Sequence, residues 1–347
     1  MKKSKKNYKF PSELRYDVVS RDWVVIATGR AKRPHMFKRE KKKRVKDSKK
    51  ECPFCNIDTQ KSPTLIFVKG KQVDLRNGIP SNWTTIIIPN KYPAFLPLDD
   101  FQITEEGPFY HKLPAVGYHE VVITRDHEKQ IAQFSQKEIE ELIEVYRTRY
   151  LQLKNKKFVN YIFIFHNHGP EAGASISHPH SQIITTPLVD KDLIKALSNA
   201  RRFYRKHKKC IYCEMNKWEE KSKKRIVFEN KRFIAVCPYA SKSAFQVIIS
   251  PKKHNPYFEK ISKEDVKDLA EIVKAVFRKL YKGLNDPSYN FYFHTSPCDG
   301  KSYPYYHWHW TIIPKLSIPA GFEMSAGMEI STIEPEKAAE YLRKIKI

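Results

Sequence analysis

The sequence has no long run of apolar residues, which argues against a membrane-spanning helix. Such a helix needs about 20 consecutive apolar residues, and no stretch of the 347 residues approaches that length. The lysine-rich start, residues 1–6, is not followed by an apolar segment and so lacks the form of a secretory signal. We therefore expect a cytoplasmic protein that does not bind membranes.

Acidic residues are few compared with basic ones. The chain has 38 Asp and Glu against 64 Lys and Arg, a formal net charge of +26, and such an excess can indicate a nucleic-acid partner. However, the basic residues gather in loop-like stretches such as 38–50, which holds nine Lys or Arg in thirteen positions. These stretches lack the interleaved aromatic residues of a surface that binds single strands. We expect a solvated, lysine-rich surface, with a zinc-containing nucleic-acid-binding protein as the alternative.

Cysteines are also few, but four of the six occur as two C-x-x-C pairs. In a reducing compartment this pattern indicates metal sites. Hydrophobic residues make up 41% of the chain, and 20 Phe, 19 Tyr and 5 Trp are enough for substantial cores. The length suggests about two domains.

The most distinctive stretch is residues 166–187. The apolar run before it, 161–165, predicts a buried strand. A loop rich in glycine and serine follows, and such loops let backbone N–H groups approach an anion. In an extended chain, residues two apart share a face. One face of the next strand would therefore carry two imidazoles and an amide, from His178, His180 and Gln182.

The chain also repeats itself. His127 and His254 are 127 residues apart, and His178 and His307 are 129 apart. Each half also has a capping box that opens an amphipathic helix, at 135–150 and 262–280. We predict an α+β fold of two copies of one unit, residues 1–195 and 196–347, each a mostly antiparallel sheet with one main helix.

Each half supplies two cysteines and two histidines that could hold a metal. Two thiolates and two imidazoles suit tetrahedral zinc, and four protein ligands leave no open position, so both ions would be structural. A single four-cysteine site and a redox C-x-x-C are alternatives, but each pair has its own downstream histidines. His309 is a fifth candidate in the second half. The expected zinc ligands are Cys52, Cys55, His127 and His178 in the first half and Cys210, Cys213, His254 and His307 in the second.

If His178 binds zinc, His180 is the free imidazole on that face. Its unperturbed pKa of ~6.5 leaves it neutral at pH 7, as a nucleophile must be. It could attack the α-phosphorus of a nucleoside diphosphate sugar, with a loop carbonyl fixing its other nitrogen. The second half has no matching loop and has Thr311 in place of Gln182, so we expect it to be catalytically silent. Donors to the developing charge are expected from Gly173, Ala174, Ser175 and Gln182.

The stretch 169–182 resembles the active-site signature of the galactose-1-phosphate uridylyltransferases, in the histidine-triad superfamily. It is similar also to the plant-type ADP-glucose phosphorylases, which share its Ala-Gly-Ala-Ser loop. In the family the second histidine of His-Pro-His, here His180, is the nucleophile. The resemblance implies two histidine-triad-like units and further contacts to the nucleotide or its phosphates from Arg30, Arg33, Asn90, Asn167 and Ser175.

The resemblance implies ping-pong uridylyl transfer from UDP-glucose to galactose 1-phosphate, in a homodimer whose active sites borrow residues from the partner. Phosphorolysis of ADP-glucose is the alternative. The second metal set, with two Cys and two His, matches the plant type, and residues 320–329 lack the lysine of the classical enzymes. Pro179 instead favours uridylyl transfer, because the plant type has Ser there. Lys91 replaces the acidic neighbour of the classical nucleotide-binding Asn, here Asn90.

Overall fold

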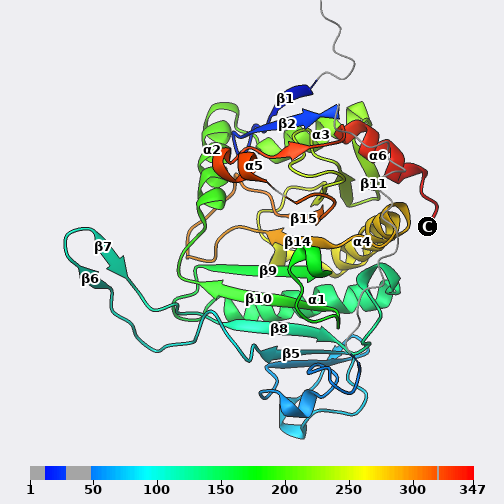
Figure 1. The fold of residues 1–347 in the computed structure, drawn as a ribbon. Coiled ribbons are helices and arrows are strands. Elements are labelled where there is room, and N and C mark those ends of the chain that lie inside the picture. The colour runs from blue at the N-terminus through cyan, green and yellow to red at the C-terminus, as the bar shows by residue number, and fades with distance from the viewer. Residues whose placement is uncertain (1–11, 29–47, 319) are drawn as a thin grey trace, which may run out of the picture.

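The computed structural model describes residues 12–28, 48–318 and 320–347, and its centre is one eleven-stranded antiparallel sheet (Figure 1). Hydrogen bonds join each strand to the next across this sheet. From one edge to the other, the strands are β11 (Ile226–Glu229), β12 (Phe233–Val236), β13 (Val247–Pro251), β15 (His309–Pro314), β14 (Tyr289–His294), β9 (Tyr161–His168), β10 (His180–Thr186), β8 (His119–Thr124), β5 (Thr85–Pro89), β3 (Leu65–Val68) and β4 (Lys71–Gln72).

The two halves of the chain meet in the middle of this sheet. β14 pairs with β9, with Asn290 opposite Asn167, and the order β8-β10-β9 on one side is mirrored by β13-β15-β14 on the other. The α+β class and the mostly antiparallel strands of both halves are therefore confirmed. Residue 195 lies inside a helix, α2 (Lys191–His207), and a domain boundary there stays a prediction.

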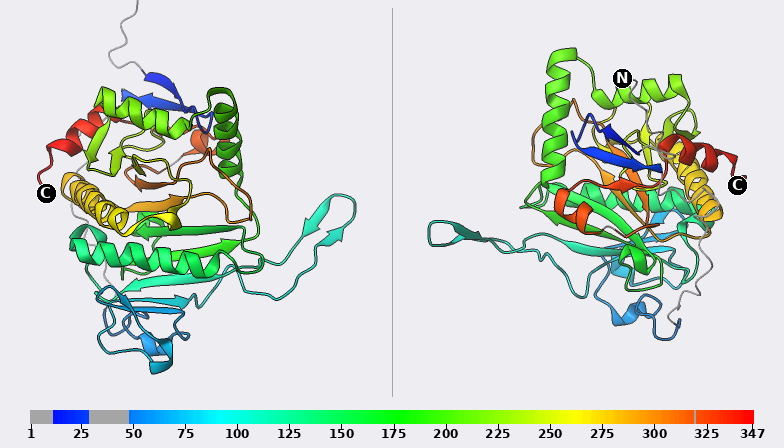
Figure 2. Two further views of the ribbon diagram at one scale, coloured as in Figure 1. Left: turned by 180° about the vertical axis from the view of Figure 1, so that it is seen from behind. Right: turned by 45° about the horizontal axis from the view of Figure 1, so that its top comes forward.

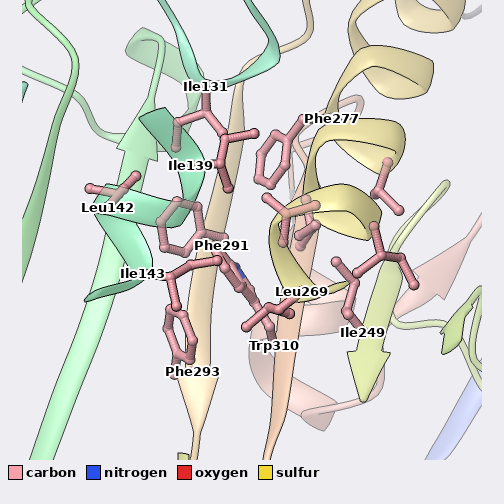
Figure 3. Close-up of a cluster of buried hydrophobic side chains, with 14 of the residues drawn as sticks. Ile131, Ile139, Leu142, Ile143, Ile249, Leu269, Phe277, Phe291, Phe293 and Trp310 are labelled. Carbon is pink, nitrogen blue, oxygen red and sulfur yellow. The ribbon is translucent and has the colours of Figure 1, made fainter. Parts of the chain in front are cut away.

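One long helix from each half, α1 (Gln136–Leu153) and α4 (Lys263–Leu284), covers one face of the sheet (Figure 2). Both begin at the expected capping boxes, where the hydroxyls of Ser135 and Ser262 accept from backbone N–H groups three residues on. Buried side chains of the helices pack on aromatic side chains of β14 and β15 (Figure 3), and burying each large apolar side chain contributes about 1.5–3 kcal/mol. The labelled members are Ile131, Ile139, Leu142, Ile143, Ile249, Leu269, Phe277, Phe291, Phe293 and Trp310.

The period-2 alternation of the strands leaves the opposite face for chemistry. In β10, Ser181 and Ile183 are buried on the helix side, whereas His180 and Gln182 lie on the other face and are partly exposed. In β9, Asn167 shares that second face. Of the three side chains predicted to share this face, His180 and Gln182 do so within β10, whereas His178 precedes the strand and is fully buried.

The remaining elements surround this framework. The amphipathic helices α2, α3 and α6 were not predicted from the sequence. In the described residues no helix has the length and apolar character needed to cross a membrane. The elements around the main sheet and its two long helices are, besides α2, the helices α3 (Ile211–Ser222), α5 (Gly321–Ala326) and α6 (Pro335–Lys344), a small sheet of β1 (Ser12–Tyr16), β2 (Trp23–Ala27) and β16 (Ile330–Ser331), the hairpin β6 (Thr104–Glu106) and β7 (Tyr110–Lys112), and the 3-10 turns η3 (Ile57–Thr59), η4 (Leu75–Asn77), η5 (Ile131–Gln133), η6 (Pro170–Ala172) and η7 (Phe258–Lys260).

The repeat is not kept everywhere. The segment after Asn90 differs from the segment after Asn230 in the second half, which forms β12. Instead it makes a single bridge, Leu96 to Val116, and continues into the β6–β7 hairpin, which projects from the body of the protein (Figures 1 and 2). Pro93 lies in this segment and has no N–H for a ladder. β5 pairs directly with β8, as β12 pairs with β13 in the second half.

Candidate active site and metal sites

The loop between β9 and β10 is shaped by the turn η6. Gly173 ends the turn at a φ of +84°, a left-handed conformation that favours glycine. Its N–H donates to the Pro170 carbonyl at 3.0 Å, and the Ala174 N–H donates to the Gly169 carbonyl at 3.2 Å. These two N–H groups therefore already have acceptors, which corrects the expectation that they are donors for an anion. Ser175, the next residue, is exposed.

His180 opens β10 with its imidazole fixed in one tautomer. Its Nδ1 lies 2.9 Å from the carbonyl oxygen of His178 and donates to it, which leaves Nε2 with a free lone pair. A loop carbonyl was predicted to hold this nitrogen, but the sequence did not show which residue provides it. Burial lowers the pKa of His180, and the hydrogen bond to His178 raises it by less. The Phe54 ring, from the first C-x-x-C, lies edge-on at 5.0 Å. The ring is thus neutral and oriented, as a nucleophile must be.

Two amides beside His180 are held by their oxygen atoms. Gln182 Oε1 accepts from His119 Nε2 at 2.8 Å, and Asn167 Oδ1 accepts from Asn290 Nδ2 at 2.8 Å. Each amide therefore has its NH₂ end left as a donor. Asn90 belongs to the same group, because its Nδ2 lies 3.1 Å from His119 Nε2. The structure thus brings together Asn90 and Gln182, and places Asn167 on the strand next to that of Gln182.

His119 and Asn290 were missed by the sequence analysis. His119 begins β8, and the signal for it was a polar residue on the strand face that also carries Val121 and Ile123. Asn290 had no signal, because only the pairing of β14 with β9 brings it to the loop. Arg30 and Arg33, predicted at the nucleotide, lie outside the described residues.

The second half also anchors the loop. Besides Asn167, Asn290 Nδ2 donates to the Ala172 carbonyl at 2.8 Å, and the Ser288 hydroxyl donates to a Glu171 carboxylate oxygen at 2.5 Å. All three contacts run from β14 or its approach to β9 or η6. The loop of the first half is therefore built on a strand of the second.

The first predicted metal set comes together. The ligand atoms of Cys52, Cys55, His127 and His178 all lie within 4.8 Å of one another. Cys55 Sγ is 3.3 Å from Nδ1 of His127 and 3.6 Å from Nδ1 of His178.

The hydrogen bonds around this set fit a metal. His178 Nε2 donates to the Thr124 carbonyl at 2.7 Å, which turns Nδ1 toward the cysteines as in many metal-binding histidines. Burial lowers the pKa of His178 to about 4, so the ring is neutral. Burial and the neighbouring Cys52 raise the pKa of Cys55 to about 11, so a cation is needed to keep this sulfur as a thiolate. These residues fit Zn²⁺.

The second set repeats this arrangement. The ligand atoms of Cys210, Cys213, His254 and His307 lie within 4.8 Å of one another. Cys213 Sγ is 3.4 Å from Nδ1 of both histidines. The Nε2 atoms donate to backbone carbonyls, at 2.9 Å from His254 and 2.8 Å from His307. This set also fits Zn²⁺, and His309 is not a member of it.

His309 copies the hydrogen bond of His180 but not its surroundings. Its Nδ1 donates to the His307 carbonyl at 3.1 Å. Aromatic rings crowd it, with Tyr212 at 5.5 Å and His294 at 4.8 Å, and burial lowers its pKa to about 4. Thr311, in the place of Gln182, is buried and carries no amide.

The chain is similar to known proteins over almost its whole length. A family model described as "Galactose-1-phosphate uridyl transferase, N-terminal domain" matches residues 1–190, and one for a domain of unknown function (DUF4921) matches residues 113–345. The ADP-glucose phosphorylase of Arabidopsis thaliana is 32% identical over 96% of this chain and 93% of its own. A galactose-1-phosphate uridylyltransferase of Thermotoga maritima is 31% identical over 96% and 99%.

Solved structures show the same fold. A crystal structure of the Arabidopsis ADP-glucose phosphorylase with bound ADP-glucose has a TM-score of 0.79 at 30% identity, covering 97% of this chain and all of that one. A structure described as a uridylyltransferase has a TM-score of 0.71 at 25% identity, covering 95% of this chain and 97% of that one. The family expected from the sequence is thereby confirmed, and the chain is an enzyme of the galactose-1-phosphate uridyl transferase family.

Proposed function

We propose that the enzyme transfers a nucleotidyl group from a nucleoside diphosphate hexose through a covalent intermediate on His180. The observation that carries this proposal is the hydrogen bond from His180 Nδ1 to the His178 carbonyl, which leaves Nε2 unprotonated. A histidine held in this tautomer, on a strand that also presents a glutamine amide, suits attack on phosphorus.

In the first half-reaction, the Nε2 lone pair attacks the α-phosphorus and forms a P–N bond. The bond from that phosphorus to the bridging oxygen breaks, and hexose 1-phosphate leaves with the electron pair. The ring keeps its Nδ1 proton and becomes cationic, and the His178 carbonyl stabilises that charge. In the second half-reaction, a phosphate oxygen of the acceptor attacks the same phosphorus, and the P–N electron pair returns to Nε2.

Side-chain donors would stabilise the charge that develops on the phosphoryl oxygens. The candidates are the NH₂ groups of Gln182 and Asn167 and the hydroxyl of Ser175. A preorganised donor of this kind typically lowers a barrier by ~3–4 kcal/mol. Gly173 and Ala174 contribute by shaping the loop, and Asn90 is assigned to the nucleotide.

Two structural zinc ions complete the proposal, one in each four-residue set. The first would tie the segment 52–55 to residues that follow β8 and precede β10, and the second would tie the start of α3 to residues that follow β13 and precede β15. Bound zinc would supply cross-links and would take no part in the reaction, because four protein ligands leave no coordination position open.

We propose UDP-glucose as donor and galactose 1-phosphate as acceptor, a choice supported by the similarity to relatives named galactose-1-phosphate uridylyltransferase. A second candidate is phosphorolysis of ADP-glucose. Two observations favour it: the Arabidopsis enzyme is 32% identical over 96% of this chain, and the second metal set has the two Cys and two His that the resemblance implies for the plant type.

We also infer a homodimer in the cytoplasm. The β6–β7 hairpin exposes Phe109 by 78% and Tyr110 by 69%, and α5 exposes Met324 by 78%, a large apolar area for a lone chain. All six cysteines are unpaired, which suits a reducing compartment.

Rapid-quench labelling tests the mechanism and identifies the donor. UDP-glucose and ADP-glucose, each radiolabelled in the nucleotide, are mixed separately with enzyme without acceptor. An acid-labile label on the protein is expected from one of them and from none with His180→Ala. Galactose 1-phosphate or inorganic phosphate is then added, and release of UDP-galactose or of a nucleoside diphosphate identifies the acceptor. Turnover without any labelled protein would rule out the covalent intermediate.

A further inference from the structure

We propose that His119 is a positioning residue that decides which end of the Gln182 amide faces the reacting phosphate. The proposal rests on the function proposed above and adds a residue to it. The side chain of His119 is partly buried, and its position in β8 is opposite Ile184 of β10, two residues after Gln182. It contacts the amide and not the reacting imidazole.

The tautomer of His119 is fixed by the backbone. The Ala94 N–H donates to His119 Nδ1 at 3.0 Å, so this nitrogen carries a lone pair. In the neutral ring the proton is therefore on Nε2. Nε2 lies 2.8 Å from Gln182 Oε1 and donates to it. The oxygen end of the amide is thus engaged by the imidazole.

Asn90 does not compete for this proton. Its Nδ2 lies 3.1 Å from His119 Nε2, but both atoms carry hydrogen, so neither accepts from the other. Nor can the Asn90 amide be turned around, because its Oδ1 accepts from the Tyr92 N–H at 2.9 Å. Gln182 Oε1 is therefore the acceptor for His119.

This arrangement matters because an amide has two chemically opposite ends. With Oε1 held, the NH₂ group of Gln182 is available to the phosphoryl oxygens. If the amide turned over, its oxygen would face those anionic oxygens and repel them. Two backbone N–H groups, of Ala94 and Tyr92, thus set the orientation of the amides of Gln182 and Asn90.

Two substitutions of His119 separate positioning from mere packing. An asparagine side chain ends at the level of Nδ1, so His119→Asn keeps an acceptor for Ala94 and removes the donor to Gln182. A glutamine reaches the level of Nε2, so His119→Gln restores that donor. We expect His119→Asn to slow nucleotidylation of the enzyme about 10- to 100-fold, the loss typical of a misplaced catalytic group. KM for the nucleotide sugar should change less than about twofold, because the lost interaction belongs to the transition state.

The same substitutions are then made in a Gln182→Ala background. If His119 acts through Gln182, His119→Asn should add less than about a twofold further loss there, since the two residues form one unit. His119→Gln alone should recover most of the wild-type rate. Unchanged thermal unfolding and metal content show that each variant is folded.

Three results would overturn the proposal. They are a raised KM with unchanged kcat in His119→Asn, an equal loss with and without Gln182, and a His119→Gln enzyme no faster than His119→Asn. Failure of the proposed function gives a different result. In that case the wild type takes no nucleotide label, or Gln182→Ala reacts as fast as the wild type.

Discussion

The amide of Asn290 donates to Asn167 Oδ1 at 2.8 Å across the pairing of β14 with β9. Asn290 belongs to the half of the chain for which no catalytic histidine is proposed, and Asn167 is next to the candidate active-site loop of the other half. The same Nδ2 also donates to the Ala172 carbonyl. The second half therefore has a structural task in the active site, which a silent copy of a catalytic unit would not need.

Asn290→Asp should slow the enzyme. The substitution keeps the shape but replaces the donor by a carboxylate oxygen that faces two acceptors, so the loop must move. We expect a loss of about tenfold or more in kcat, because small displacements of catalytic groups are costly. Initial rates at saturating substrate measure it. Asn199→Asp is the matched control. Asn199, in α2, likewise donates to a backbone carbonyl, that of Val19 at 2.9 Å. Equal losses in both variants would contradict the role of Asn290.

His180→Ala and His309→Ala should behave differently. Both histidines donate from Nδ1 to the carbonyl two residues earlier, but His309 is packed among aromatic rings. His180→Ala should lose nearly all labelling by nucleotide sugar, whereas His309→Ala should keep it and lose some thermal stability. A folded His309→Ala protein without activity would show that the second half also reacts.

The sequence predicted the strands, the main helices and both metal sets because these depend on local patterns. Alternation, capping boxes and C-x-x-C pairs can be seen within short windows. The internal repeat then predicted that the same α+β unit occurs twice. His178 and His180 were assigned different roles because His178 completes the first Cys and His set and because the resemblance implies that the second histidine of His-Pro-His is the nucleophile. The hydrogen bonds of the two rings support this division.

What could not be predicted depends on contacts between distant segments. The pairing of β14 with β9 unites the halves in one sheet, and no local pattern encodes which edges meet. His119 reaches Gln182 only because β8 lies beside β10. The hydrogen bonds within η6 also could not be predicted, because a glycine-rich loop can turn its N–H groups inward or outward.

The two metal sites should release zinc at different rates. In the first, Cys52 and His178 are fully buried. In the second, His254 is exposed and the site borders a cavity of about 550 Å³ that is also lined by Lys209 and Lys217. A chelator should therefore remove one zinc per chain rapidly and the other slowly, as measured with a metal-sensitive dye.

Variants identify the two phases. Cys213→Ser should abolish the fast phase and leave the slow one. Cys55→Ser should remove the slow phase and lower the temperature of unfolding, because structural zinc contributes folding free energy. Fewer than two zinc ions in protein expressed with sufficient zinc would contradict both assignments.

Glu336 should make stability depend on pH. It lies in the first turn of α6 and accepts from Arg15 of β1 at 2.9 Å and from Arg225 at 2.7 Å, so it joins the small sheet to the body. Burial alone would raise the pKa of Glu336, but the hydrogen bonds from Arg225 and Arg15 outweigh it and lower the pKa. Glu336→Gln should therefore lower the free energy of unfolding at pH 7 by about 1–3 kcal/mol.

The direction of the pH effect follows from the lowered pKa. A carboxylate with a lower pKa in the folded state stabilises the fold at pH values above its unfolded pKa, about 4.3. That stabilisation is lost as the pH falls through the lower, folded value. Urea unfolding from pH 7 to pH 3 should thus show the wild type and Glu336→Gln converging at the acidic end. Glu340→Gln, on the exposed side of the same helix, is the control and should follow the wild type throughout. A difference between the wild type and Glu336→Gln that stays constant, or grows toward pH 3, would show that the two arginines do not hold the carboxylate in its charged form.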